Sequence, residues 1–233
     1  MLTDRVLFID GEAIVIDKPS GLAVDPPRDG SPSLGDQLDD LRFGFRRLPL
    51  PVHRLDRDTS GCLLLARNPK AHKRFGAAFE AGIVRKTYLA VLDGVPAEQA
   101  GRVELALGKV SSKEEGWRMV PDEAGKRAVT DWRVLAEANG RALVRFTPET
   151  GRTHQLRVHA ASGIGVPILG DPVYGTVSGF KMLLHAASLG LDREGKEPIA
   201  ATAPLPIGFA NAGFGQLDLG QVDLGQVDLG DAL

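Results

Sequence analysis

The sequence between residues 53 and 66 joins a dense polar loop to an apolar strand. The loop reads His53-Arg54-Leu55-Asp56-Arg57-Asp58-Thr59-Ser60-Gly61, and the strand that follows reads Cys62-Leu63-Leu64-Leu65-Ala66. A polar segment that ends in glycine and continues into an apolar run is typical of a loop held on a rigid strand, where proteins often place reactive groups. The alternative is a solvated turn whose Asp and Ser side chains only satisfy neighbouring backbone groups.

The length and composition of the chain are those of an ordinary globular protein. Its 233 residues are enough for a hydrophobic core, and 43% of them are hydrophobic. No apolar run approaches the roughly 18 residues that span a bilayer. The N-terminus lacks the basic start and apolar run of a signal peptide. With Cys62 as the single cysteine, no internal disulfide can form, and we expect a cytoplasmic protein in which Cys62 fills the core.

The charge of the chain is unevenly distributed. The formal net charge is −2, yet the window from Leu41 to Ala90 holds eleven Lys or Arg against three acidic residues, which makes it +8. A basic band around the polar loop is what a phosphate backbone would require, so the distribution favours an RNA or DNA partner. A solvated surface with scattered Lys and Arg would also explain the count.

The order of apolar runs and turns predicts a mainly antiparallel sheet. Helices are expected around 34–41, from Pro69 behind the N-cap Asn68 to about Gly82, and from Thr153 to about Ser162. Closely spaced strands with few helices between them favour an α/β fold of the α+β type, with a central mixed, mainly antiparallel sheet flanked by helices and loops. The expected strands are 13–17, 62–66, 85–92, 102–107, 128–135, 142–146 and 182–191.

The C-terminal residues differ from the rest of the chain. Three pentapeptides of the form Gln-Leu/Val-Asp-Leu-Gly follow one another from Gln216, and residues 217–233 contain four Asp and no Lys or Arg. Three copies of five residues are too few to stack into an independent solenoid. We therefore expect one catalytic domain over residues 1–210 and a disordered acidic tail over 211–233.

A second polar segment runs through Thr150-Gly151-Arg152-Thr153-His154-Gln155-Leu156-Arg157-Val158-His159. His154 and Arg157 stand three residues apart on the expected helix, so both could reach a shared target. Two histidines with Asp nearby also suggest a metal site. The spacing matches no known zinc pattern, however, and an Arg at the centre would repel a cation, so no metal is expected.

At this point the motifs together resemble those of the RluA-type RNA pseudouridine synthases. The segment His53–Asp56 followed by Thr59-Ser60-Gly61 is similar to the active-site signature of that family. Further family features recur in the same order over roughly residues 7–206. They are Lys18-Pro19-Ser20-Gly21-Leu22, Arg85-Lys86-Thr87-Tyr88-Leu89-Ala90, Gly151–His159, Gly170-Asp171-Pro172 with Tyr174-Gly175, and Leu183-Leu184-His185-Ala186.

The resemblance implies an isomerase that needs neither cofactor nor metal and that converts uridine to pseudouridine in rRNA, tRNA or both. Asp56 would be the catalytic carboxylate, Arg157 would pair with it, and Tyr88 would stack on the flipped uracil and serve a later proton removal. Arg54 would fill the space that the base leaves. The remaining expected residues line the pocket or support the loop: Leu183, Leu184, Thr59, Ser60 and His154.

Two other functions compete with this interpretation. A non-catalytic RNA-binding protein with the same fold would be expected to lack Asp56 or Tyr88, and both are present. A hydrolase would use Asp56 with His53 to activate water. Many relatives carry an N-terminal RNA-binding module of the S4 type, which we expect this chain to lack, so its partner, an RNA stem-loop, would be bound by the catalytic domain alone. We expect a monomer with no obligatory protein partner and no membrane association.

Overall fold

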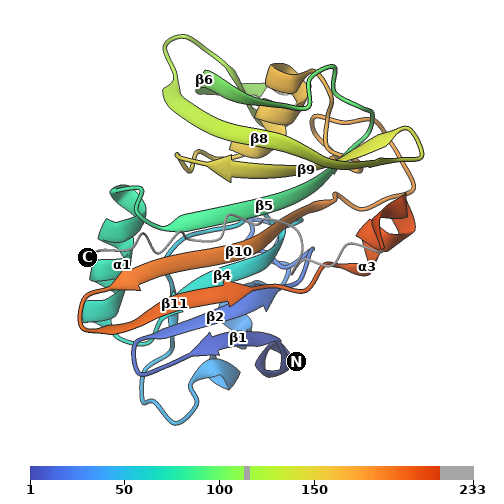
Figure 1. Cartoon of the computed structure of the whole chain (residues 1–233). Helices are drawn as coiled ribbons and strands as arrows, with labels where there is room; N and C mark the ends of the chain where they lie inside the picture. Colours follow the sequence, from blue (N-terminus) through green and yellow to red (C-terminus); the bar gives the residue numbers. More distant parts are fainter. Residues whose placement is uncertain (113–115, 216–233) are drawn as a thin grey trace, which may run out of the picture.

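The computed structural model describes residues 1–112 and 116–215, and within these ranges eleven strands form a single sheet (Figure 1). The strands are β1 (Val6–Ile9), β2 (Ala13–Lys18), β3 (Leu50–Pro51), β4 (Ser60–Ala66), β5 (Arg85–Leu92), β6 (Ala100–Ser112), β7 (Gly116–Pro121), β8 (Lys126–Ala138), β9 (Arg141–Pro148), β10 (Leu184–Arg193) and β11 (Lys196–Thr202). Their order across the sheet is β1-β2-β4-β10-β5-β9-β8-β6-β7, with β3 paired to β4 and β11 to β10.

Helices are few and mostly short. The α-helices are α1 (Pro69–Glu80), α2 (Gln155–Val158) and α3 (Ile207–Phe209). Three 3-10 turns span Leu2–Arg5, Leu34–Gln37 and Asp39–Leu41, and π-helical turns continue α2 over His159–Ile164 and α3 over Ala210–Phe214. Asn68 caps α1 by accepting a hydrogen bond from the Ala71 N–H at 2.9 Å, as its position before Pro69 predicts.

Strand β4 is the centre of the N-terminal half because both of its faces are buried. Cys62 and Leu64 point to the face that α1 covers with Phe75. Leu63 and Leu65 point to the opposite face, which the segment between β2 and β3 covers. A strand buried on both sides needs an unbroken apolar run, which explains the sequence Cys62–Ala66.

The pairing of β4 with β10 is parallel, and all the other strand pairs within the described part of the chain are antiparallel. Gly61 lies opposite Ala186 in this pair, with φ +104°, and a Cβ at Gly61 would lie 2.2 Å from the Ala186 carbonyl oxygen. Only glycine fits there without a shift of backbone. The contact places the polar loop before β4 directly beside β10.

The predicted fold class is confirmed, and several element boundaries needed correction. The segment predicted as one helix at 34–41 is two 3-10 turns, and the helix predicted from Thr153 begins at Gln155. Strands β1, β3, β7 and β11 were not predicted. The folded part also continues past residue 210, because Ala212 and Phe214 are buried against β5 and β9. The rest of the predicted tail, 216–233, lies outside the described residues.

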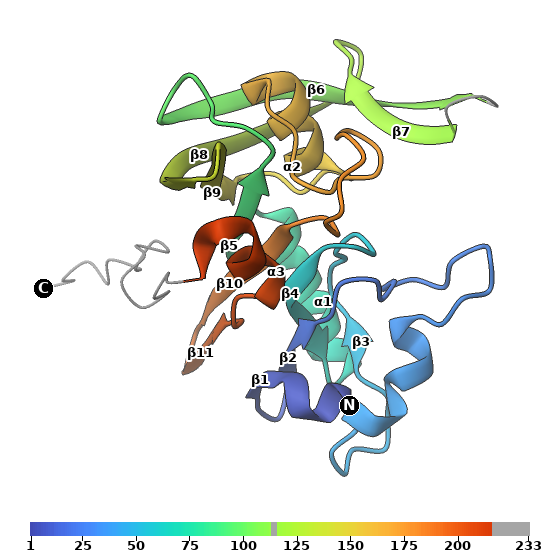
Figure 2. The ribbon, with the colours of Figure 1, turned by 90° about the vertical axis from the view of Figure 1, so that its right-hand side faces the viewer.

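Two views show where the functional segments lie. In Figure 2 the β6–β7 hairpin and the loop that follows β2 project from the same side of the molecule, above and below the loop that leads into β4. No helix within residues 1–112 and 116–215 is long and apolar enough to cross a membrane.

Candidate active site

The loop between β3 and β4 borders a cavity of about 450 Å³, a size usual for ligand-binding pockets. It lies between this loop, β5 and the start of α2. Seven of the nine predicted site residues line it: Arg54, Asp56, Thr59, Tyr88, His154, Arg157 and Leu184. The fold therefore brings together residues that are up to 130 positions apart in the sequence.

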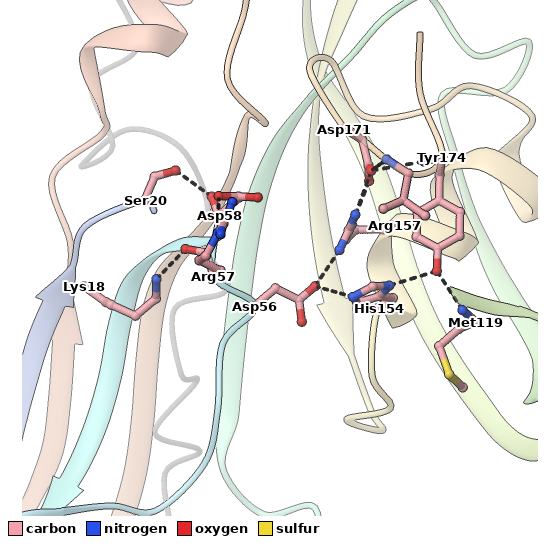
Figure 3. A network of polar contacts seen from close by, with 11 residues as sticks. Lys18, Ser20, Asp56, Arg57, Asp58, Met119, His154, Arg157, Asp171 and Tyr174 are labelled. Atoms are coloured by element: carbon pink, nitrogen blue, oxygen red, sulfur yellow. Dashed lines mark hydrogen bonds and ion pairs between the residues drawn. The ribbon is translucent and has the colours of Figure 1, made fainter. Parts of the chain in front are cut away.

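The polar loop is held by the segment after β2. The Lys18 ammonium is fully buried and donates to three backbone carbonyls, those of Pro19 at 2.9 Å, Leu22 at 2.8 Å and Arg57 at 3.0 Å. Ser20 Oγ donates to the Asp58 carbonyl at 2.8 Å (Figure 3). Burial lowers the pKa of Lys18 to about 8, and the nearby Asp58 and Asp56 carboxylates oppose that shift. These bonds fix the backbone at Arg57 and Asp58, the two residues that follow Asp56.

Arg157 connects Asp56 to a buried carboxylate (Figure 3). Its Nη1 lies 3.2 Å from Asp56 Oδ2, while Nε and Nη2 donate to the two oxygens of Asp171, each at 2.7 Å. Burial opposes the charge on Arg157, but Asp171 and Asp56 raise the pKa of its guanidinium above the usual value. Asp171 also accepts from the Val173 and Tyr174 N–H groups, and its pKa is lowered although burial acts in the opposite direction. Arg157 and Asp171 are therefore a charged, bidentate pair.

His154 approaches Asp56 from another direction. Its Nε2 lies 3.8 Å from Asp56 Oδ2, and its Nδ1 lies 2.8 Å from the Tyr174 hydroxyl, which also accepts a hydrogen bond from the Met119 N–H (Figure 3). The Trp117 ring meets the imidazole edge to face at 4.8 Å between centroids. Burial lowers the pKa of His154, against the attraction of Asp56. His154 has left-handed backbone angles, φ 53° and ψ 15°, which are unusual for a residue other than glycine and occur often at functional sites.

Tyr88 and Leu184 form the apolar side of the cavity. Tyr88 is half-buried between two parts of the core, and burial raises the pKa of its phenol. Leu184 lines the cavity, but the prediction for Leu183 was wrong. Leu183 points to the other face of the sheet and packs in the cluster of Leu89 and Phe209. Consecutive residues of an extended chain point to opposite sides, so only one of the two leucines can face the cavity.

The hydroxyl residues of the loop differ in position. Thr59 lines the cavity, whereas Ser60 does not and instead shares a 2.9 Å hydrogen bond with the buried His185. Of the two roles expected for Ser60, lining the pocket or supporting the loop, only the second fits this contact, because the hydroxyl joins β4 to β10. Arg54 lies at the mouth, largely exposed, with its Nη1 2.9 Å from Asp25.

The position of His53 weakens the hydrolase interpretation. Its Nε2 accepts a hydrogen bond from the Leu64 N–H at 3.0 Å, and its ring stacks on Phe79 with centroids 4.4 Å apart. Burial lowers the pKa of His53 to about 3, so the imidazole is neutral at physiological pH. A ring committed to the backbone and to Phe79 is not placed to activate water for Asp56.

The structure adds residues to which the sequence assigned no role. Asp171 and Tyr174 belong to a quoted motif, but nothing in their spacing shows that they hold Arg157 and His154. Lys18 was likewise part of a motif without an assigned contact. Among the described residues, no group of three or more His, Cys, Asp or Glu could hold a metal ion.

Comparison with known proteins identifies the family of this chain. The model of the RNA pseudouridylate synthase family matches residues 12–162. An RNA pseudouridine synthase of Zymomonas mobilis is 58% identical, over 91% of this chain and 99% of the relative. Ribosomal large subunit pseudouridine synthase C of Rickettsia felis is 37% identical, over 90% of this chain and 70% of the relative.

A solved structure supports the same assignment. Human RNA pseudouridylate synthase domain containing 4 superposes with a TM-score of 0.76 at 28% identity, covering 91% of this chain and 92% of the human chain. The resemblance found in the sequence is thereby confirmed. The chain belongs to the RNA pseudouridylate synthase family, and it is an isomerase that converts uridine to pseudouridine in RNA.

Proposed function

We propose that this enzyme isomerises uridines of ribosomal RNA with Asp56 as the catalytic carboxylate. The observation that carries the assignment is the placement of Asp56, which is one-fifth exposed at the cavity, 3.2 Å from the Arg157 guanidinium. A carboxylate that is oriented by a buried cation and is also accessible from the cavity can contact a substrate atom. The relatives named as ribosomal large subunit pseudouridine synthases support rRNA as the substrate. tRNA is the second candidate.

The reaction breaks the bond between uracil N1 and ribose C1′ and forms a bond from C5 to C1′. A proton leaves C5 and a proton is gained at N1, so the atoms balance without any co-reactant. Whichever atom Asp56 attacks or deprotonates, its carboxylate must be ionised and correctly oriented. Arg157 supplies the orientation, and Tyr88 is the candidate for the proton removal from C5.

The cavity walls suit a flipped base. A uracil that leaves its stack needs a flat or apolar partner on each face, and Tyr88 and Leu184 provide such surfaces. Arg54 stands at the mouth, and we assign to its guanidinium the position that the flipped base leaves in the RNA. Lys86 and Arg152 also line the cavity and add positive charge for the flanking phosphates. We propose that the protein acts in the cytoplasm as a monomer on an RNA stem-loop, without a protein partner.

The test is to incubate the protein with rRNA and tRNA transcripts and to map pseudouridine by chemical modification. Wild-type protein is expected to modify a small set of uridines in rRNA. Asp56→Asn is expected to bind the same RNA and to modify none. An active Asp56→Asn variant would overturn the role of that residue. RNA that is bound by wild-type protein but left unchanged at every uridine would favour the non-catalytic alternative, and modification confined to tRNA would overturn the rRNA assignment.

A further inference from the structure

A second hollow, of about 420 Å³, lies between the loop after β2 and the β6–β7 hairpin. It is lined by Arg28 from the loop and by Lys109, Ser111 and Trp117 from the hairpin, and we call these four residues the Trp117 cradle. The two segments that form it project on the same side of the molecule (Figure 2). The cradle is thus built from two segments, which lie on either side of the polar loop between β3 and β4.

The chemistry of the cradle is aromatic and cationic. Trp117 is 39% exposed, which is unusual for a side chain of this size, and Lys109 Nζ lies 5.7 Å from its ring centroid. Arg28 supplies a second positive charge. The neighbouring Asp29 carboxylate is engaged by the Ser31 backbone and hydroxyl. An open indole beside two cations suits one ligand class well, a nucleotide, whose base stacks on the ring and whose phosphate meets the charges.

The cradle is connected to the catalytic site through one side chain. The Trp117 ring contacts His154 edge to face at 4.8 Å, and His154 Nε2 lies 3.8 Å from Asp56 Oδ2. The His154 side chain therefore lies between Trp117 and Asp56, the residue at which the proposed function binds the uridine.

We propose that the Trp117 cradle binds a nucleotide close to the target uridine on the same RNA strand. The base stacks on Trp117, and Arg28 and Lys109 contact the phosphate. The inference rests on the proposed function, and it adds a site that selects an unstacked nucleotide beside the target. Because every base has a stacking face, the cradle demands an unpaired nucleotide rather than a particular base.

Tryptophan fluorescence tests the stacking directly. The chain has two tryptophans, and Trp132 is only 8% exposed, so Trp132→Phe leaves Trp117 as the single reporter. Titration of this variant with an rRNA fragment that the enzyme modifies is expected to quench the Trp117 emission in proportion to the RNA bound. A duplex of the same length without unpaired nucleotides is expected to quench it much less. Full binding and modification without any change in Trp117 emission would overturn the proposal.

Matched variants test the contribution to binding. Trp117→Ala is expected to raise KM at least about fivefold, and Trp117→Phe is expected to recover most of the loss because a phenyl ring also stacks. Arg28→Gln and Lys109→Gln are each expected to lower the slope of log Kd against log salt by about 0.7. Lys196→Gln, at the β10–β11 turn, makes the same change of charge away from the cradle and is expected to leave the slope unchanged.

The outcomes separate this proposal from the proposed function. If wild-type protein modifies no uridine, the function is overturned whatever Trp117 does. If wild-type protein modifies uridines while Trp117→Ala keeps its KM and both glutamine variants keep the salt slope, the function stands and the cradle is overturned.

Discussion

Arg157 binds its two carboxylate partners unequally, because Asp171 receives two hydrogen bonds at 2.7 Å and Asp56 receives one at 3.2 Å. The side chain of Asp171 is fully buried, whereas that of Asp56 is 20% exposed. Asp171 therefore fixes the plane of the guanidinium, and the remaining nitrogen is presented to Asp56. The proposed catalytic carboxylate, Asp56, is therefore oriented indirectly, through the buried Asp171 that holds its partner Arg157.

Asp171→Asn should damage both stability and activity. The substitution removes the negative charge that compensates the buried Arg157 and places an amide where four N–H donors converge. We expect a loss of about 3–5 kcal/mol in the free energy of unfolding and a large fall in kcat, measured by denaturant titration and initial rates. Asp131→Asn is the matched control, because that carboxylate pairs with Arg102 at the surface and should cost less than about 1 kcal/mol. Equal losses in the two variants would contradict the assigned role of Asp171.

The parts of the fold with a periodic or capping signal could be predicted from the sequence. The apolar run Cys62–Ala66 indicated a strand buried on both faces, and Asn68-Pro69 marked the start of α1. β7 escaped prediction because its exposed and half-buried residues, Gly116–Pro121, show no apolar alternation. The choice between Leu183 and Leu184 depends on where β10 begins, which composition does not indicate.

The contacts between distant residues could not be predicted from local patterns. The segment after Ile168 turns back toward α2, and this turn brings Asp171 to Arg157. The same turn brings Tyr174 to His154. Such contacts depend on tertiary packing rather than on propensity. The family motifs located these residues without indicating what each one touches.

Tyr174→Phe should change the orientation of His154 without removing the ring beside it. The hydroxyl accepts from the Met119 N–H and keeps its own hydrogen. We predict that it donates this hydrogen to His154 Nδ1, 2.8 Å away, which leaves the hydrogen of the imidazole on Nε2, toward Asp56. We expect a loss of about 1–2 kcal/mol in stability and about a tenfold fall in kcat. Nitrogen NMR of the wild-type protein should report the Nε2–H tautomer, and the variant should lose that preference. Finding the Nδ1–H tautomer in wild-type protein would reverse the assigned direction of the hydrogen bond.

Gly61→Ala and Gly76→Ala should change stability in opposite directions. At Gly61 the new Cβ would lie 2.2 Å from the Ala186 carbonyl oxygen in a backbone with φ +104°, so β4 and β10 must separate beside the active-site loop. We expect a loss of more than about 3 kcal/mol and little activity. Gly76 lies inside α1, and an added Cβ would have no atom within 4 Å apart from neighbouring residues and the backbone of α1 itself. Alanine there should raise the free energy of unfolding by about 0.5–1 kcal/mol. The pair is compared by thermal and denaturant unfolding, and a tolerated Gly61→Ala would contradict the close approach of the two strands.

Two buried histidines should make the protein sensitive to mild acid. His159 lies against Thr130 and His185 against Ser60, and burial lowers the pKa of each to about 4 from an ordinary value of 6.5. Between pH 6.5 and pH 4 these two histidines bind protons in the unfolded chain and stay neutral in the folded chain. Their contribution to stability is therefore present above pH 6.5 and is lost progressively down to pH 4, at up to about 1.4 kcal/mol per pH unit for each histidine. Denaturant unfolding at several pH values should show this slope, and His159→Gln with His185→Gln should reduce it. A double variant with the wild-type slope would show that other groups bind the protons.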